Sequence, residues 1–186
     1  MTAARAVVIG ASAGALEALS VILPALPEDF ALPVFIVVHI PPDKKSVLAE
    51  LFRAKCVLPV REVEDKEPIL GGTIYFAPPD YHLLVEDELT LSLSVEEQVL
   101  FSRPSIDVLF ESASDVYGAG LVGLVLTGAN HDGASGLRSI VSAGGVALVQ
   151  SPKVAFSAAM PEAAISACPT AHILSLTEIT SFLKKV

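Results

Sequence analysis

Three continuous apolar runs restrict the fold of this chain more than any other feature. They are RAVVIG at 5–10, PVFIVVHI at 33–40 and GLVGLVLTG at 120–128. A strand with one solvent-facing side alternates apolar and polar residues, whereas a run that is apolar throughout is typical of a strand buried on both faces of a parallel sheet. Helical patterns follow at 14–24, 45–55 and 133–142. This order of strand and then helix predicts an α/β fold with a doubly wound, mainly parallel sheet.

Further segments extend this pattern. VALVQ at 146–150 predicts another buried strand, and AHILSL at 171–176 predicts an edge strand. A helix is expected from Pro104 to Gly118, because proline favours the first helical position and glycine the position after the last. We expect the final helix to start at Thr177, with the threonine hydroxyl as its cap.

The stretch from 57 to 94 has a different character. TIYFA, HLLVED and LTLSLS are short, alternate in polarity and are separated by turn residues, as in antiparallel hairpins. The whole chain has 186 residues, of which 52% are hydrophobic, and this suffices for one large core. We therefore interpret the stretch as an antiparallel hairpin insertion and predict a single domain over 1–186.

Charge and cysteine content exclude several classes of protein. The net charge is -9 and the basic residues are scattered, which argues against nucleic-acid binding. Cys56 and Cys168 form no C-x-x-C motif, so we expect no zinc site or disulfide framework, and a cytoplasmic location. Glu17 argues against a signal peptide, and no run approaches the roughly 18 apolar residues that would predict membrane insertion.

One polar residue follows each of the three buried strands. Ligands bind at the carboxyl ends of the strands in open α/β sheets, and there this chain has Ser12, His39 and Asp132. A serine hydroxyl becomes a strong nucleophile when an imidazole takes its proton, and a carboxylate orients that imidazole. The three residues are therefore predicted to form a catalytic triad.

The serine lies in GASAG at 10–14, which matches G-x-S-x-G, a motif of sharp strand-to-helix turns. The backbone N–H of Ala13 is predicted to stabilise an oxyanion. On this pentapeptide alone, Ser12 fits the N-cap of a helix equally well. Phosphate binding is not supported, because Ser12 and Ala15 replace two glycines of the dinucleotide motif and no P-loop lysine follows.

The roles of the histidines and of Asp132 have alternatives. A lone histidine that closes an apolar strand is often a hydrogen-bonded core residue, but the strand-end position of His39 favours a general base. His131 stays open as an alternative base because it adjoins Asp132. Asp132 would also serve as a cap of the 133–142 helix. His82 is interpreted as structural.

Arg103 is a candidate for binding a substrate carboxylate. It lies directly before Pro104, at the start of a predicted helix. A salt bridge with Asp107, four residues further on, accounts for this arginine equally well.

Taken together, GASAG, VVHIPP and TGANHDGASG resemble the catalytic domain of CheB, the chemotaxis receptor methylesterase family. The resemblance runs from about Ala6 into the final helix and includes IYFAPPDYHL, RPSIDVLF and MPEAAI. It implies a doubly wound fold with an antiparallel hairpin, and hydrolysis of glutamate γ-methyl esters on the cytoplasmic helices of chemoreceptors, with glutamine deamidation in some members. It places the nucleophile on Ser12, the base on His39 and the carboxylate on Asp132, and implies no metal or organic cofactor.

The chain departs from this family at two loops. Many members have Thr and Gly where this chain has Ala13 and Ala15, and the later loop often reads GMGNDG where residues 128–133 read GANHDG. Backbone N–H groups survive such changes, so Ala13 and Ala129 are still predicted to line the oxyanion or substrate site. The usual receiver domain is missing, which predicts a stand-alone esterase domain. The departures also motivate an alternative, a non-catalytic binding module that docks on a receptor or signalling protein.

Overall fold

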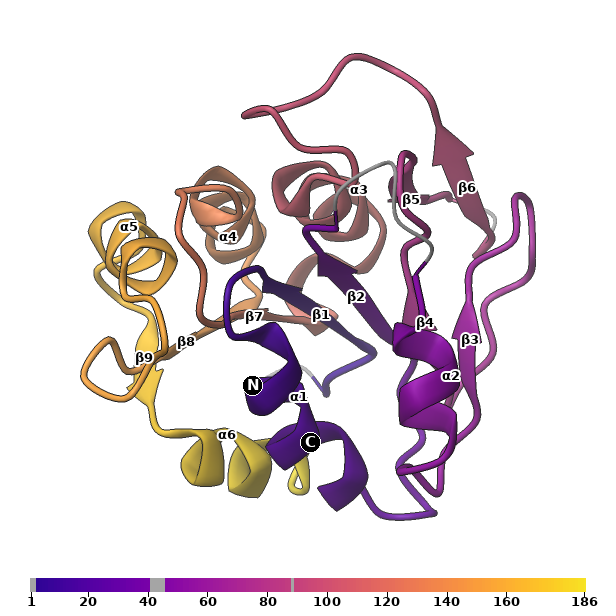
Figure 1. Cartoon of the computed structure of the whole chain (residues 1–186), viewed down its shortest axis with the longest axis horizontal. Coiled ribbons are helices and arrows are strands. Elements are labelled where there is room, and N and C mark those ends of the chain that lie inside the picture. The colour runs from indigo at the N-terminus through magenta and orange to yellow at the C-terminus, as the bar shows by residue number, and fades with distance from the viewer. Residues whose placement is uncertain (1–2, 41–45, 88) are drawn as a thin grey trace.

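A seven-stranded parallel sheet forms the centre of the computed structural model, which describes residues 3–40, 46–87 and 89–186 (Figure 1). Its strand order is β3-β4-β2-β1-β7-β8-β9, and every pair of neighbours is parallel. The strands span β1 (Ala6–Ala11), β2 (Val34–Val38), β3 (Val60–Glu62), β4 (Ile74–Phe76), β7 (Leu121–Val125), β8 (Val146–Gln150) and β9 (His172–Leu174). Every residue of β1, β2 and β7 is buried, which explains why these strands are apolar throughout. The predicted doubly wound sheet is confirmed.

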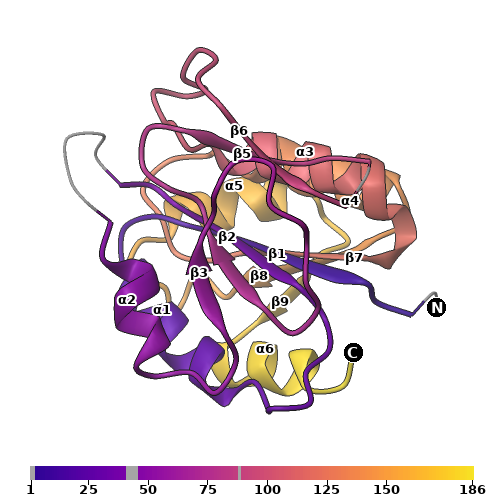
Figure 2. The same cartoon turned by 90° about the vertical axis from the view of Figure 1, so that its right-hand side faces the viewer.

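Helices cover both faces of this sheet (Figures 1 and 2). One face packs on α1 (Ala15–Ile22), α2 (Leu48–Arg53) and α6 (Leu176–Leu183), and the other on α3 (Ile106–Tyr117), α4 (Ala134–Ser142) and α5 (Ala159–Ala167). Short 3-10 turns follow α1 at Leu23–Ala25 and α3 at Gly118–Gly120. Alternate residues of β1 enter the two cores, with Val7 and Ile9 in one and Ala6 and Val8 in the other. The carboxyl end of β1, which precedes Ser12, is thus anchored by a strand that cannot shift without disturbing both cores.

The prediction for 57–94 is partly wrong. TIYFA is a strand, as expected, but it does not belong to a hairpin. It supplies β4, which lies in the main sheet between β2 and β3. The sequence pattern did not predict β3. Burial on both faces explains the place of β4, because Tyr75 stacks on Phe35 with ring centroids 5.6 Å apart and Phe76 stacks on Phe52 at 5.5 Å. The antiparallel pair consists of β5 (His82–Val85) and β6 (Leu91–Ser94).

Several helix boundaries also differ from expectation. α3 begins two residues after Pro104, so this proline precedes the helix and is not its first residue. Ser175 caps α6, with a reciprocal hydrogen bond to Glu178, so the prediction of Thr177 as the cap is wrong. The reason is that Ser175 has extended backbone angles and has a glutamate three residues later, which is the capping-box arrangement. The predicted helix at 45–55 is α2, and its expected start at residue 45 lies outside the described residues.

None of the helices in the described part of the chain is both long enough and apolar enough to cross a membrane.

Candidate active site

The register of the central strands brings Ser12 and His39 side by side. Ala11 pairs with Val38 at the ends of β1 and β2, so Ser12 and His39 are the next residues on each strand. The N–H of His39 donates to the carbonyl of Ala11 at 3.2 Å, and the N–H of Ser12 donates to the carbonyl of Thr127 at 2.9 Å. Ser12 therefore lies between the chain segments that leave β2 and β7.

The loop after Ser12 has backbone N–H groups without a backbone partner in the described part of the chain. The N-cap of α1 is Gly14, at φ 84°, and no side chain caps this helix, so the interpretation of Ser12 as an N-cap is wrong. The hydroxyl of Thr127 donates to the carbonyl of Ala13 at 2.8 Å and so holds the loop. Among the described residues, no backbone acceptor faces the N–H of Ala13 or of Gly14. Backbone N–H groups without a backbone acceptor are the kind of donor that an oxyanion hole uses, so Ala13 stays a candidate for this role and Gly14 joins it.

His39 and Asp132 are in direct contact. The Nε2 atom of His39 lies 2.8 Å from Oδ2 of Asp132, and the carboxylate is completely buried. His131, the alternative base, is exposed to solvent. The structure therefore brings His39, and not His131, to the carboxylate.

Four more donors hold the Asp132 carboxylate. The Ser105 hydroxyl donates to it at 3.0 Å, the backbone N–H of Ile106 at 2.7 Å, that of Asp107 at 2.9 Å and that of Gly133 at 3.0 Å. The first three groups form the N-terminus of α3. Asp132 thus caps a helix, but this helix is α3; the N-cap of the predicted 133–142 helix is Gly133, with no side-chain cap.

These contacts decide the charge of Asp132. Burial by itself would raise the pKa of this carboxyl group, but the hydrogen bonds from His39 and from the N–H groups of Asp107 and Ile106 outweigh it, and the pKa is lowered. The positive end of the α3 dipole acts in the same direction. Asp132 is therefore anionic at neutral pH and suited to stabilise an imidazolium on His39.

The second ring nitrogen of His39 faces Asn130, a residue that the sequence analysis missed. Nδ2 of Asn130 lies 3.4 Å from Nδ1 of His39, and Oδ1 of Asn130 accepts the N–H of Asp132 at 3.1 Å. An asparagine two residues before a strand-end aspartate is a signal for such a turn. The contact with His39 could not be found in this way, because 91 residues separate the two positions.

Comparison with known proteins identifies the family of this chain. A family model described as CheB methylesterase matches residues 7–183. The chain belongs to the CheB methylesterase family. A protein of Leptospira interrogans is 49% identical over 175 residues, which cover 94% of this chain and 91% of that protein. The protein-glutamate methylesterase/protein-glutamine glutaminase of Archaeoglobus fulgidus is 37% identical over 162 residues. These residues cover 86% of this chain and 46% of that relative.

A solved CheB structure has the same fold. The crystal structure of the Thermotoga maritima CheB methylesterase catalytic domain superimposes with a TM-score of 0.93 at 28% identity, over 99% of both chains. The methylesterases of this family are hydrolases, and the predicted family and fold are confirmed.

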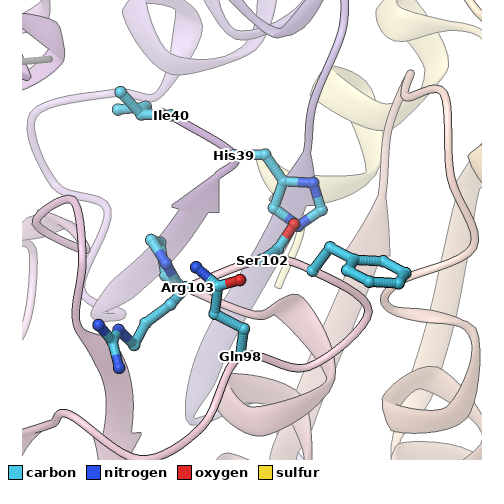
Figure 3. A pocket seen from close by; sticks show the side chains of 7 residues that line it. His39, Ile40, Gln98, Ser102 and Arg103 are labelled. Atoms are coloured by element: carbon cyan, nitrogen blue, oxygen red, sulfur yellow. The ribbon is translucent and has the colours of Figure 1, made fainter. Parts of the chain in front are cut away.

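Two hollows flank the candidate site of this CheB-family chain. One, of about 210 Å³, is lined by His39, Ile40, Gln98, Phe101, Ser102, Arg103 and Pro104 (Figure 3). The other, of about 330 Å³, includes Ser12, Leu16, Val38, Ile40 and Val47 in its lining. Because Ile40 lines both, the edge that carries Ser12 and His39 lies between them.

Arg103 has structural partners. Its Nε and Nη2 atoms donate to Oδ1 of Asp80 at 3.1 and 2.7 Å, and Nη1 donates to the backbone carbonyls of residues 95 and 96. The carboxylate of Asp107 instead accepts the N–H of Gly136 at 2.6 Å. The alternative of a salt bridge between Arg103 and Asp107 is therefore wrong, and a role for Arg103 in substrate binding stays a prediction.

Within residues 3–40, 46–87 and 89–186, no three His, Cys, Asp or Glu side chains gather to hold a metal ion. Cys56 and Cys168 are free thiols.

Proposed function

We propose that this chain is a serine esterase that hydrolyses glutamate γ-methyl esters on the cytoplasmic helices of chemoreceptors or of a related signalling protein. The observation that carries this proposal is the contact between His39 and the buried carboxylate of Asp132, beside Ser12, in a chain of the CheB methylesterase family. Deamidation of glutamine at the same site is a second reaction of the same chemistry, because an amide and an ester both pass through a tetrahedral oxyanion.

In the first half of the proposed reaction, Oγ of Ser12 attacks the ester carbonyl. Nε2 of His39 is hydrogen-bonded to Asp132, so Nδ1 is the nitrogen that takes the Ser12 proton. The negative charge on the carbonyl oxygen is stabilised by the backbone N–H groups of Ala13 and Gly14, and Ala129 is the next candidate for this role. His39 then returns the proton to the departing methoxide oxygen, methanol leaves, and the glutamyl group stays esterified to Ser12.

In the second half, His39 removes a proton from water, and the resulting hydroxide attacks the glutamyl ester. The bond to Ser12 breaks and Oγ recovers its proton from His39. The product is a glutamic acid side chain, which releases its remaining proton to solvent and leaves as the carboxylate. No step requires a metal or an organic cofactor. A cytoplasmic protein substrate fits this proposal, whereas the net charge of -9 argues against a nucleic-acid partner.

The test is methanol release from a receptor-helix peptide that carries one glutamate γ-methyl ester. The intact protein is expected to release methanol, and Ser12→Ala is expected to lose this activity by several powers of ten. Binding of the same peptide is measured in parallel. Equal binding by both proteins without turnover by either would contradict the esterase and support the non-catalytic binding module.

A further inference from the structure

Asn130 contacts both members of the His39–Asp132 pair. Its Oδ1 atom accepts the N–H of Asp132 at 3.1 Å, and its Nδ2 atom lies 3.4 Å from Nδ1 of His39. The first contact fixes the orientation of the amide, since only the oxygen can accept a hydrogen bond. The nitrogen, which is solely a donor, therefore faces the imidazole.

The orientation of the Asn130 amide determines which tautomer the His39 imidazole adopts. A donor opposite Nδ1 requires a lone pair on that nitrogen, so the ring hydrogen of neutral His39 is on Nε2 and is donated to Asp132. A ring turned by half a rotation would place carbon-bound hydrogens against both the amide and the carboxylate. Asn130 and Asp132 together therefore favour one ring orientation and one tautomer.

We infer that Asn130 is a positioning residue that keeps Nδ1 of His39 as the nitrogen that accepts the Ser12 proton. The inference rests on the proposed function, because it takes His39 as the general base. At 3.4 Å the contact is long and weak, so it yields when a proton arrives at Nδ1. The cost of releasing it is small compared with the benefit of an oriented base.

Two variants separate this role from a purely structural one. Asn130→Asp keeps an oxygen that accepts the N–H of Asp132, but it replaces the donor opposite Nδ1 by an acceptor. Asn130→Ala removes both contacts. If Asn130 only stabilised the turn, Asn130→Ala would lower the activity, and Asn130→Asp would have the activity of the parent protein. His131→Ala is the control, because it changes an exposed neighbour.

The inference predicts the opposite order. Asn130→Asp is expected to lower kcat for the methyl ester by roughly a hundredfold and Asn130→Ala by roughly tenfold, with KM within about threefold of the parent value in both. In Asn130→Asp the acidic limb of the pH profile is expected to move to higher pH. The reason is that a second carboxylate beside the ring, in addition to Asp132, favours the protonated imidazole. His131→Ala is expected to match the parent.

Imidazole ¹⁵N NMR of the resting proteins tests the inference without requiring turnover. The parent protein at alkaline pH is expected to show His39 with its hydrogen on Nε2, and Asn130→Asp is expected to keep the charged ring to higher pH. A hydrogen on Nδ1 in the parent, or an unchanged titration in Asn130→Asp, would overturn the inference whatever the activity. A parent protein with the expected resonances but no esterase activity would refute the proposed function and leave the effect of Asn130 on the ring standing.

Discussion

His39 and Asp132 are 93 residues apart in the chain, and their side chains are 2.8 Å apart in space. The carboxylate of Asp132 is fixed by the first N–H groups of α3 and by the Ser105 hydroxyl. The orientation of the imidazole therefore depends on the start of a helix that supplies no member of the proposed triad. This dependence leads to predictions for residues on α3 as well as for the triad.

Replacing Asp132 by asparagine is expected to lower kcat for the methyl ester by roughly 10⁴-fold, because a neutral amide neither stabilises the imidazolium nor fixes its tautomer. The amide nitrogen would also face N–H donors of α3, so the free energy of unfolding is expected to fall by about 1–3 kcal/mol. Steady-state kinetics and urea unfolding measure the two effects. A variant with more than a tenth of the parent kcat would show that Asp132 has no catalytic role.

Ser105→Ala removes one neutral donor from the same carboxylate. The completely buried hydroxyl of Ser105 donates to Oδ1 of Asp132 at 3.0 Å. Loss of this hydrogen bond is expected to lower kcat by roughly tenfold, because the Asp132 carboxylate is then less firmly oriented. The matched control is Ser135→Ala, because the Ser135 hydroxyl contacts Glu111 on α3 away from Asp132. Equal activity of the two variants would contradict the prediction.

Asp107 gives the folded protein a pH-dependent stability. Burial, together with the nearby charge of Asp132, raises the pKa of Asp107 from 3.8 to about 6, although the hydrogen bond from Gly136 opposes this. The folded state then binds more protons than the unfolded state between about pH 4 and pH 6, so this group lowers the free energy of unfolding as pH rises through that window.

Asp107→Asn keeps an oxygen for the Gly136 N–H and removes the charge. The variant is expected to be more stable than the parent at pH 8 by on the order of 1 kcal/mol, with a smaller difference at pH 4.5. Urea unfolding at the two pH values measures this. Asp115→Asn, an exposed change on the same helix, is the control; an advantage of Asp107→Asn that is the same at both pH values would contradict the assignment.

Phe101 is expected to contribute to the recognition of a protein substrate. Its side chain is 95% exposed and lines the hollow beside His39. Phe101→Ser is expected to raise KM for a methylated receptor helix by roughly tenfold and to leave a small glutamate methyl ester unaffected, since aromatic contacts often dominate protein recognition. Val57→Ser, a 66% exposed apolar position outside both hollows, is the control. Equal effects on the helix and the small ester would exclude a recognition role.

The sequence predicted the strands whose residues are apolar because both faces of the strand are buried. β1, β2 and β7 are buried on both faces, and their apolar runs indicated this directly. β4 was assigned to a hairpin because Ile74–Phe76 is as short as a hairpin strand and adjoins turn residues. The partners that place it in the main sheet, Phe35 and Phe52, are more than twenty residues away, and local periodicity carries no information about them.

The same limit applies to the site. Strand-end positions were enough to predict Ser12, His39 and Asp132, because parallel strands present their carboxyl ends at one edge. The partner of Arg103 was predicted by helical spacing, yet the structure pairs it with Asp80 from another loop. The amide of Asn130 and the N-terminus of α3 reach His39 and Asp132 only through the tertiary fold, so no spacing rule predicts these contacts.

The most direct test of the account is to trap the covalent intermediate during turnover of a short glutamate γ-methyl ester peptide. Acid quenching within the first turnovers, followed by proteolysis and mass spectrometry, locates the acyl group. The account predicts the glutamyl adduct on the peptide that contains Ser12, and its loss in Ser12→Ala. Methanol release with an unmodified Ser12, or with the adduct on another residue, would contradict the claim that Ser12 is the nucleophile.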